Sequence, residues 1–580
     1  MFRFLTNIWS NWQCDGVCRR ATVWLIRKKN RNMKRNVPNV SAQACQVVIF
    51  CSEAVCLSLL TEEWPMLNRA VNRSQNYILP APVGGLNQRD GLDNMPETDA
   101  VVMDNYYPAE TKVCLRGGYK IYALRGNGLK TETLIPFCSP GHNRIFAAAG
   151  GKIVNITSGS ETTEAENLLN NRWHYVQFRN RLLLVNGVDE PLSYLQNEDG
   201  EWKWQQTALE GEGLDKSMLN RIAVSKQRVF YVEKNSLVYW YSEGVGEVQG
   251  NLCRVDLSPL VSRGGSLAAV AGWTRDGGEG MDDMTVFITT EGEVLVYTGN
   301  NPGNADDWSL KGKYYISRPV GEYCTMQYRG DLVVICEEGY MPLSSVIYMA
   351  EGGTSGAAYS DKIRGLVLER VKNNKNLSGW QSVIYPRGGY ALFNVPVRGQ
   401  FEQHVINMSS GAWCRFTNIY ALCWCLFEGR LFFGSDSGVY LFDEGHSDDG
   451  RPILGNVHQA YCSLGTPNLK KIQMLNPRTK SSSAFALNIY TNMDFNDEER
   501  SYAENIGHEG GCKWNGSKWS SLKAPSGTKW ATLKGSIRSR WIGNNAAGFK
   551  ASLVFKTKTR GNLIEWYNTG FRFETGGGVV

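Results

Sequence analysis

Short runs of β-branched and aromatic residues, separated by turns, recur along most of the chain. In the stretch 284–346, two such runs flank Glu291 and Gly292, where glycine supplies the positive φ that a tight hairpin turn requires. A polar loop ending in Trp308 leads to the next run, and another hairpin follows around Gly330. Strand, turn and strand in this order are typical of a β-propeller blade or a β-sandwich.

Hairpins of this kind are expected throughout residues 117–445. The candidates are 144–157, 173–195, 221–241, 284–315, 325–349, 382–413 and 422–442. Their first residues are separated by 29, 48, 63, 41, 57 and 40 positions, which straddles the roughly 40–50 residues of a propeller blade. We therefore expect an all-β chain whose centre is a β-propeller of about six blades, with seven or eight as the alternative.

The pattern changes near Arg451, where the apolar runs become longer. The candidate strands are 460–464, 471–475, 484–491, 529–537, 550–557 and 561–573. Polar loops separate them, which favours a sandwich. We expect an additional C-terminal β-sandwich-like domain over residues 446–580.

Residues 66–116 form a loop-rich entry segment that is expected to fix the chain onto its core. Pro96 and the acidic residues after it predict a short helix over 99–105. The carboxylates could alternatively belong to a calcium loop, but the one-three-five spacing with a glutamate at position twelve is absent, so solvated caps are favoured. These carboxylates are Asp90, Asp93, Glu97, Asp99 and Asp104.

Residues 1–65 differ in composition from the rest, because they hold one of the 61 glycines but five of the 15 cysteines. The apolar run 42–60 is interrupted by polar residues, so no membrane span is expected. Cys14 and Cys18 lack a second ligand pair at zinc-finger spacing. Because Met66 opens a segment that reads like a natural N-terminus, residues 1–65 are interpreted as an atypical arm or an extended reading frame.

Net charge is +6, and its distribution matters more than its size. Residues 1–65 carry nine basic and four acidic side chains, or +5, which leaves 53 basic and 52 acidic residues, or +1, for the remainder. A body so close to neutral does not hold nucleic acid by bulk charge. The odd number of scattered cysteines favours reduced thiols and assembly in a reducing cytoplasm.

The common catalytic and cofactor motifs are absent from the sequence: there is no P-loop, no dinucleotide-binding glycine motif and no His-Glu-x-x-His. The six histidines occur singly, and the acidic pairs are neighbours in turns, whereas a glycosidase needs two carboxylates facing each other across a cleft. These pairs are 282–283, 306–307, 337–338 and 448–449. We therefore predict no enzyme, no catalytic, metal or cofactor residues, and no cofactor.

Two further segments have alternative interpretations. Residues 435–440 (SDSGVY) faintly resemble the Asp box of sialidases, but without the full spacing they predict a hairpin turn. Lysine–tryptophan neighbours at 513–514, 518–519 and 529–530 fit either a stacking platform for single strands or sugars, or strands with Trp inward and Lys outward. The second interpretation is favoured.

Several short motifs occur together in the first half of the chain. The first group comprises Pro82-Val83-Gly84-Gly85-Leu86-Asn87, Arg89-Asp90, Met95-Pro96, Asp99-Ala100, Asn105-Tyr106-Tyr107-Pro108 and Arg116-Gly117-Gly118. The second comprises Tyr297-Thr298-Gly299-Asn300-Asn301-Pro302, Asp307-Trp308-Ser309-Leu310, Pro319-Val320-Gly321, Gly330-Asp331-Leu332 and Pro342-Leu343. As a set, they resemble the tail-nozzle proteins of short-tailed bacteriophages (podoviruses), also called tail tubular or DNA-stabilisation proteins.

The resemblance implies a structural virion protein of the phage tail, built on a propeller and assembled in the host cytoplasm. It implies a homo-oligomeric, six-fold ring below the portal and the head-to-tail adaptor, next to tail fibre or spike proteins. The channel of the ring would retain genomic double-stranded DNA and pass it at ejection without sequence specificity. A nearly neutral body is compatible with that role, because every phosphate neutralised adds affinity and would slow ejection.

The family has no catalytic residues to transfer, so the motif positions are candidates for structure or interfaces only. They are Gly84, Gly85, Leu86, Asn87, Arg89, Asp90, Pro96, Asp99, Pro108, Pro302, Trp308, Pro319 and Gly321. Two alternatives remain open. A propeller-type glycan hydrolase would bring two carboxylates together in one cleft, and a glycan-binding receptor module of a phage tail would line a groove with exposed Trp or Tyr.

Overall fold

The computed structural model describes residues 74–126, 128–276, 281–350, 358–482, 485–497, 504–506 and 537–576. Several sequence predictions lie outside these residues: the arm at 1–65, its zinc and membrane alternatives, and the lysine–tryptophan pairs between 513 and 530. Within the described part, the chain is all-β, as predicted, and its centre is a six-bladed propeller.

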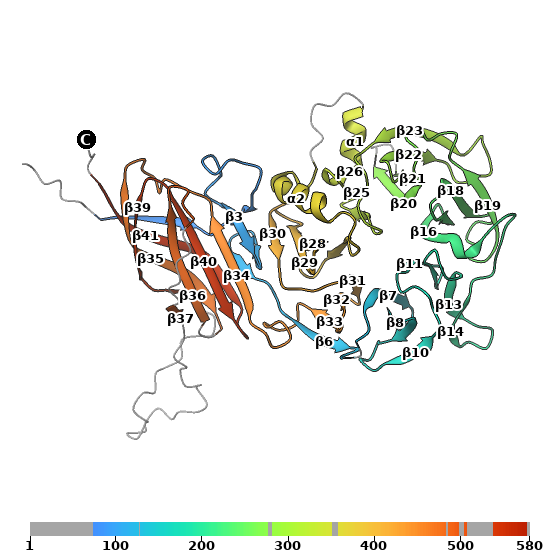
Figure 1. Ribbon diagram of the computed structural model, residues 1–580, viewed down its shortest axis with the longest axis horizontal. Helices are drawn as coiled ribbons and strands as arrows, with labels where there is room; N and C mark the ends of the chain where they lie inside the picture. The colour runs from blue at the N-terminus through green and yellow to red at the C-terminus, as the bar shows by residue number, and fades with distance from the viewer. Residues whose placement is uncertain are drawn as a thin grey trace, which may run out of the picture. The chain divides into compact units, whose positions relative to one another are not determined.

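Six separate, mostly antiparallel sheets form the blades, and Figure 1 shows them following one another around a ring in chain order. Blade 1 contains β7 (Thr131–Ser139), β8 (His142–Ala149), β9 (Lys152–Asn155) and β10 (Thr162–Ala165). Blade 2 contains β11 (His174–Phe178), β12 (Arg181–Val185), β13 (Leu192–Gln196) and β14 (Trp202–Gln206). Blade 3 contains β16 (Leu219–Ser225), β17 (Arg228–Glu233), β18 (Val238–Ser242) and β19 (Gly250–Asp256), with β15 (Leu209–Glu210) at its edge and the 3-10 turn η1 (Lys216–Met218) before it.

The second half of the ring includes the strand that closes it. Blade 4 contains β20 (Leu267–Asp276), β21 (Met281–Thr289), β22 (Glu293–Thr298) and β23 (Ser309–Tyr315), and blade 5 contains β24 (Thr325–Tyr328), β25 (Asp331–Cys336) and β26 (Gly339–Pro342). Blade 6 contains β31 (Cys423–Phe427), β32 (Arg430–Ser435) and β33 (Gly438–Phe442). Its fourth strand is β6 (Tyr119–Ala123), which comes from the start of the propeller, so the first and last parts share one blade.

A four-stranded meander lies between blades 5 and 6 in the chain. It consists of β27 (Gln381–Tyr385), β28 (Tyr390–Val397), β29 (Gln400–Asn407) and β30 (Trp413–Phe416). Gln381 in its first strand forms a bridge with Tyr323 and donates a hydrogen bond of 2.9 Å to the carbonyl of Trp424. The meander therefore fills the place between two blades, while its last strand leads out of the propeller.

The sandwich is built from both ends of the described chain. One sheet has the order β38 (Arg538–Ser539), β35 (Lys470–Ser481), β41 (Ile564–Thr575), β5 (Val113–Leu115) and β4 (Tyr106–Pro108), with β1 (Gln75–Pro80) on β41 and β39 (Ile542–Gly548) on β35. The other sheet continues from β30 through β2 (Gly85–Leu86), β3 (Asp99–Asp104), β34 (Ile453–Gln459), β40 (Ala551–Thr559), β36 (Phe485–Met493) and β37 (Glu504–Ile506). Strands from the entry segment thus complete both sheets.

Three sequence predictions are wrong. Of the residues 99–105 expected to be helical, Asp99–Asp104 form strand β3 and Asn105 follows it in a left-handed conformation, with φ of 60°. The backbone is engaged by pairing with β34 and β2, and Asp99 bonds to other side chains instead of capping a helix. The hairpin expected over 325–349 ends in helix α1 (Leu343–Ala350), whose buried residues Leu343, Val346 and Ile347 have helical spacing. Residues 460–464 make only one isolated bridge, from Cys462 to Ala551.

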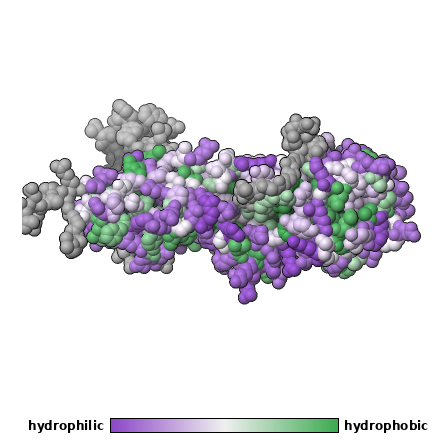
Figure 2. Space-filling view, turned by 90° about the horizontal axis from the view of Figure 1, so that it is seen from above, coloured by the Kyte–Doolittle hydropathy of each residue, from purple (hydrophilic) through white to green (hydrophobic). Residues whose placement is uncertain are grey.

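Two other short segments are helical. The 3-10 turn η2 (Asp361–Ile363) leads directly into α2 (Arg364–Asn374), and this pair follows blade 5 in the chain. None of the described helices is long and apolar enough to cross a membrane. Figure 2 shows mostly hydrophilic residues on the face seen from above, with hydrophobic residues in small groups.

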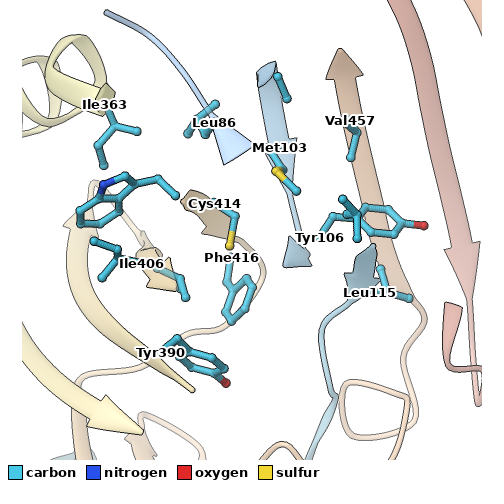
Figure 3. Close-up of a cluster of buried hydrophobic side chains, with 14 of the residues drawn as sticks. Leu86, Met103, Tyr106, Leu115, Ile363, Tyr390, Ile406, Cys414, Phe416 and Val457 are labelled. Carbon is cyan, nitrogen blue, oxygen red and sulfur yellow. The ribbon is translucent and has the colours of Figure 1, made fainter. Parts of the chain in front are cut away.

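One hydrophobic core spans the meander and the sandwich. Figure 3 shows Leu86 and Met103 from the entry strands between Ile363 on one side and Val457 of β34 on the other, with Tyr106 below Val457. Deeper in the sandwich, the rings of Phe555 and Trp566 stack with centroids 4.4 Å apart. The described part of the chain therefore buries one continuous apolar core across both sheet systems.

Candidate functional site

The motif residues from Gly84 to Asp99 meet at one place, which we call the entry junction. Its centre is the buried side chain of Asn87. The Asn87 amide nitrogen donates to Asp90 at 2.9 Å and to Asp99 at 2.8 Å. Its oxygen accepts hydrogen bonds of 3.1 Å from the backbone N–H groups of Arg89 and Asp90. One asparagine therefore fixes the loop after β2 to the start of β3.

The turn before α2 closes the entry junction from the propeller side. The ammonium of Lys362 donates to the Gly84 carbonyl at 2.8 Å and to the Asp99 carboxylate at 2.9 Å. The Asp99 side chain is only 3% exposed, so this ion pair is largely removed from water. Arg89 forms an exposed pair with Asp361 at 2.9 Å. Two parts of the chain, 263 residues apart, are joined here by charge as well as by apolar packing.

The two glycines of the entry junction are required by close contacts. Gly85 has φ +81°, and a Cβ atom there would lie 2.4 Å from the carbonyl oxygen of Trp413. A Cβ on Gly84 would lie 1.9 Å from the Asp99 carboxylate.

Hydrogen bonds also set the charge and the backbone of the entry junction. The hydrogen bond from Arg89, and to a smaller extent the one from Asn87, lowers the pKa of Asp90 to about 2. Pro96 accepts a 3.0 Å hydrogen bond from the backbone of Asp99, which shapes the turn into β3.

The other motif residues lie away from the entry junction. Pro302 and Trp308 belong to the loop between β22 and β23, where Trp308 stacks on Tyr297 with centroids 5.1 Å apart. Before β24, Pro319 forms a bridge with Cys336, and Gly321 has φ +84° with Trp380 packed against it. The carbonyl of Pro108, in β4, accepts a 2.8 Å hydrogen bond from Asn407. The structure thus brings eight of the thirteen positions together and leaves five at separate turns and packing contacts.

A largely buried ionic network next to the entry junction, with Glu402 and His404 at its centre, was not predicted from the sequence. Arg415 in β30 binds Asp104 in β3 with two hydrogen bonds, of 2.6 and 3.0 Å. Glu402 in β29 accepts a 2.6 Å hydrogen bond from Arg370 of α2 and lies 3.5 Å from Arg415. His404 extends the network, with Nε2 3.1 Å from Glu402. The network connects the helix, the meander and the sandwich sheet.

The protonation states of this network follow from burial and from its hydrogen bonds. Burial lowers the pKa of His404, and the neighbouring Glu402 opposes that shift only in part. A neutral ring satisfies both contacts, because Nδ1 accepts from the Tyr340 hydroxyl at 2.8 Å while Nε2 donates to Glu402. Burial alone would raise the pKa of Glu402, but His404, Arg370 and Arg415 together lower it to about 2. The glutamate is therefore ionised beside a neutral histidine.

A second connection, which we call the crossing, forms where the chain enters and leaves the propeller. Arg116 binds Asp448 through two hydrogen bonds, of 2.8 and 2.7 Å, and their side chains are 1% and 5% exposed. Burial raises the pKa of Asp448, and Arg116 opposes that shift. Asn105 accepts a 2.8 Å hydrogen bond from Arg116 and donates 2.8 and 2.7 Å bonds to Thr417 and the Leu454 carbonyl.

The backbones of the two linkers run side by side at the crossing. The Gly118 N–H donates to the Gly445 carbonyl and the Tyr119 N–H to the Ser447 carbonyl, both at 3.0 Å. A Cβ on Gly118 would lie 2.1 Å from the Ser447 carbonyl oxygen. The motif Arg116-Gly117-Gly118 therefore lies where the linker that enters the propeller is hydrogen-bonded to the linker that leaves it.

The carboxylates considered for a calcium loop each have another partner. Asp90 and Asp99 bind Asn87, Asp104 binds Arg415, Asp93 binds Lys550, and Glu97 accepts from the Tyr77 hydroxyl. Across the described ranges, no three His, Cys, Asp or Glu side chains are grouped to hold a metal ion. The nine cysteines in the described residues form no disulfide. The entry junction, the ionic network and the crossing are therefore suited to holding sheets together.

Comparisons with known proteins add little to this picture. No protein-family model matches the chain, and no curated protein matches it. Among solved structures, the extracellular domain of a hybrid two-component system protein from B. thetaiotaomicron is similar, with 13% identity and a TM-score of 0.36, covering 56% of this chain and 41% of that one. A protein assigned as a 6-phosphogluconolactonase from Bacteroides fragilis has 10% identity and a TM-score of 0.32, covering 57% and 91%. These similarities carry no argument about activity or ligand.

Proposed function

We propose that this chain is a structural protein of a short phage tail, which forms a nozzle ring that continues the DNA channel below the head-to-tail adaptor. The observation that carries the proposal is the entry junction. The motif positions between Gly84 and Asp99 were selected by resemblance to nozzle proteins, and they converge on the contacts that join the entry strands to the propeller. A ring that retains and passes a genome needs subunits whose parts do not shift against each other.

The continuity of the sheets supports such a mechanical role. One sheet of ten strands runs from the propeller meander into the sandwich. The half-buried pair Arg415–Asp104 and the buried pair Arg116–Asp448 hold the two regions together at two further points. Shearing the propeller against the sandwich would have to break backbone hydrogen bonds and, at the same time, separate these two ion pairs. Leaving a buried charge without its partner is costly, so the connection resists load.

A ring also requires a heterologous contact, in which one face of a subunit meets a different face of the next. Among the exposed apolar side chains that the structure describes in the sandwich, Ile78 and Trp541 lie near the same strand. Ile78, 55% exposed, is paired in register with Gly570 of β41. Trp541, 41% exposed, lies 3.9 Å from the position that a Gly570 Cβ would take. In the proposed ring, Ile78 and Trp541 form part of the contact with the neighbouring subunit.

The test is the mass of the assembly, measured by light scattering on the full chain, alone and mixed with a candidate adaptor ring. A mass of about six copies, alone or on the adaptor, is expected. Ile78→Asp should lower the mass, whereas the control Leu169→Asp, at a position 79% exposed in the propeller, should not. A monomer that ignores the adaptor would contradict the nozzle proposal.

A further inference from the structure

Blade 6 carries a hollow that the nozzle proposal does not use. Its volume is about 260 Å³, somewhat below the roughly 300–1,000 Å³ of sites for drug-sized ligands, so it suits a small ligand or one unit of a larger one. We call it the tyrosine depression. It is lined by Tyr119, Tyr420, Phe433, Ser435, Asp436, Ser437, Tyr440, Asp448, Asp449 and Arg451.

The aromatic part of the depression is held in place by ring contacts. Phe433 and Tyr440 stack with centroids 5.1 Å apart and an interplanar angle of 12°. Tyr119 meets both rings edge-on, at 5.2 and 5.4 Å. Tyr420 is supported by Phe401, which it meets edge-on at 5.1 Å. Because these contacts fix the rings before a ligand arrives, little ordering cost remains for binding.

The polar part comes from two segments that both line the depression. The turn between β32 and β33 provides Asp436 and Ser437, both exposed, and the Ser437 hydroxyl lies 2.9 Å from that of Tyr440. The exit linker provides Asp449 and Arg451, both exposed. The sequence predicted the turn correctly but gave no sign that the exit linker would pack opposite it. The depression therefore combines aromatic faces with hydroxyl, carboxylate and guanidinium groups.

This combination selects a class of ligand. Aromatic faces accept flat apolar surfaces, and carboxylate and guanidinium groups make strong hydrogen bonds to neutral donors and acceptors. A sugar ring offers a C–H face and several hydroxyls, so it can use both. A nucleotide could also stack, but its phosphate would be repelled by the exposed carboxylates of Asp436 and Asp449.

We propose that the tyrosine depression binds one unit of a neutral saccharide, with its ring face on Tyr420 and Tyr440 and its hydroxyls bonded to Asp436 and Arg451. This property does not depend on the nozzle proposal, because a monomer would present the same depression. It gives the chain a way to contact a glycan from one blade while the sandwich and entry junction serve assembly.

The test is saturation-transfer NMR on the full chain with four neutral probes: methyl α-glucoside, methyl β-galactoside, N-acetylglucosamine and rhamnose. Saturation transfer to at least one probe is expected. Asp436→Asn should weaken binding of that probe by about tenfold or more, the effect of one hydrogen bond to a charged group. The control Tyr348→Ala, at a tyrosine 55% exposed on α1, should leave it unchanged.

A second variant separates loss of ligand contact from loss of fold. Tyr420→Ala should abolish transfer while the unfolding temperature changes no more than the loss of its contact with Phe401 explains. Transfer from none of the four sugars would overturn the proposal, as would signals that persist in both Asp436→Asn and Tyr420→Ala. Transfer from AMP but not from the sugars would overturn it in favour of a nucleotide site.

Discussion

The blades and the sandwich use the same kind of strand but are connected in opposite ways. In blade 4, each strand pairs with its neighbour in sequence, from β20 to β23. In the sandwich, β1 pairs with β41, so Gln75 lies opposite Phe573, and β3 pairs with β34. Blades 1 to 5 gain contacts soon after each turn forms. Blade 6 needs β6 from the start of the propeller, and the sandwich needs the two ends of the described chain to meet. Non-local pairing of this kind slows folding and concentrates stability in a few long-range contacts.

This difference predicts that the crossing is the most sensitive point. Arg116→Ala should destabilise the protein by about 3–5 kcal/mol, because it leaves the buried Asp448 without its partner. Denaturant unfolding followed by tryptophan fluorescence would measure it, and the sandwich should unfold before the blades. Lys120→Ala, which removes an exposed ion pair with Glu444, should cost less than about 1 kcal/mol. If both variants lost the same free energy of unfolding, the Arg116–Asp448 pair would contribute no more to stability than an exposed ion pair.

A glycine pair tests the entry junction in the same way. Gly85→Ala should destabilise by about 1–3 kcal/mol, because φ is +81° and the methyl group would meet the Trp413 carbonyl. Gly91→Ala, where nothing lies within 4 Å of the new atom, should be close to neutral. Thermal unfolding of both variants measures the contrast. If Gly85→Ala were as stable as Gly91→Ala, the close approach of β2 to β30 would not be a constraint.

Acid should weaken the network between the two regions. The unfolded chain protonates its histidine as the pH falls below about 6.5, whereas buried His404, with its lowered pKa, does not follow. Glu402 acts in the same direction, since its pKa is about 2 in the fold and 4.5 in the free side chain. The stability that these two groups contribute to the fold is therefore fully present above their pKa values in the unfolded chain, about 6.5 and 4.5, and is lost as the pH falls below them. His404→Gln should flatten the dependence of the unfolding temperature between pH 7 and 5, and parallel profiles would contradict this.

The smallest stability effect is expected at an exposed motif residue. Arg89 is 50% exposed in its pairs with Asp90 and Asp361, so Arg89→Ala should cost less than about 1 kcal/mol. Asp361→Asn is the matched partner. If either variant lowers the mass of the assembly while thermal unfolding is unchanged, the exposed rim of the entry junction takes part in subunit contacts.

The same contrast explains what the sequence could and could not predict. The propeller hairpins could be predicted because turn residues and alternating apolar positions are signals between neighbours in the sequence. Turns such as Arg179-Asn180, with φ of 46° and 56°, lack the glycine that usually marks them. The helix expected at 99–105 is a strand because β34, more than 350 residues later, provides its partner. Lys362 beside Asp99 and Arg415 beside Asp104 depend on tertiary packing. Two local signals were overlooked: the helical spacing of Leu343, Val346 and Ile347 in α1, and the positions of Glu402 and His404, two residues apart on one face of β29.

The hydrogen bonds between Gly118 and Gly445 and between Tyr119 and Ser447 have an evolutionary consequence. Two chain ends that leave a domain side by side are the arrangement in which that domain can be inserted into, or removed from, a host loop without breaking the host sheet. The propeller is inserted between β5 and β34 in this way, except that its meander strand β30 also pairs with β2 and β3 of the sandwich. Removing the propeller would therefore let the two linkers join directly, but it would expose the edge that β2 now shares with β30.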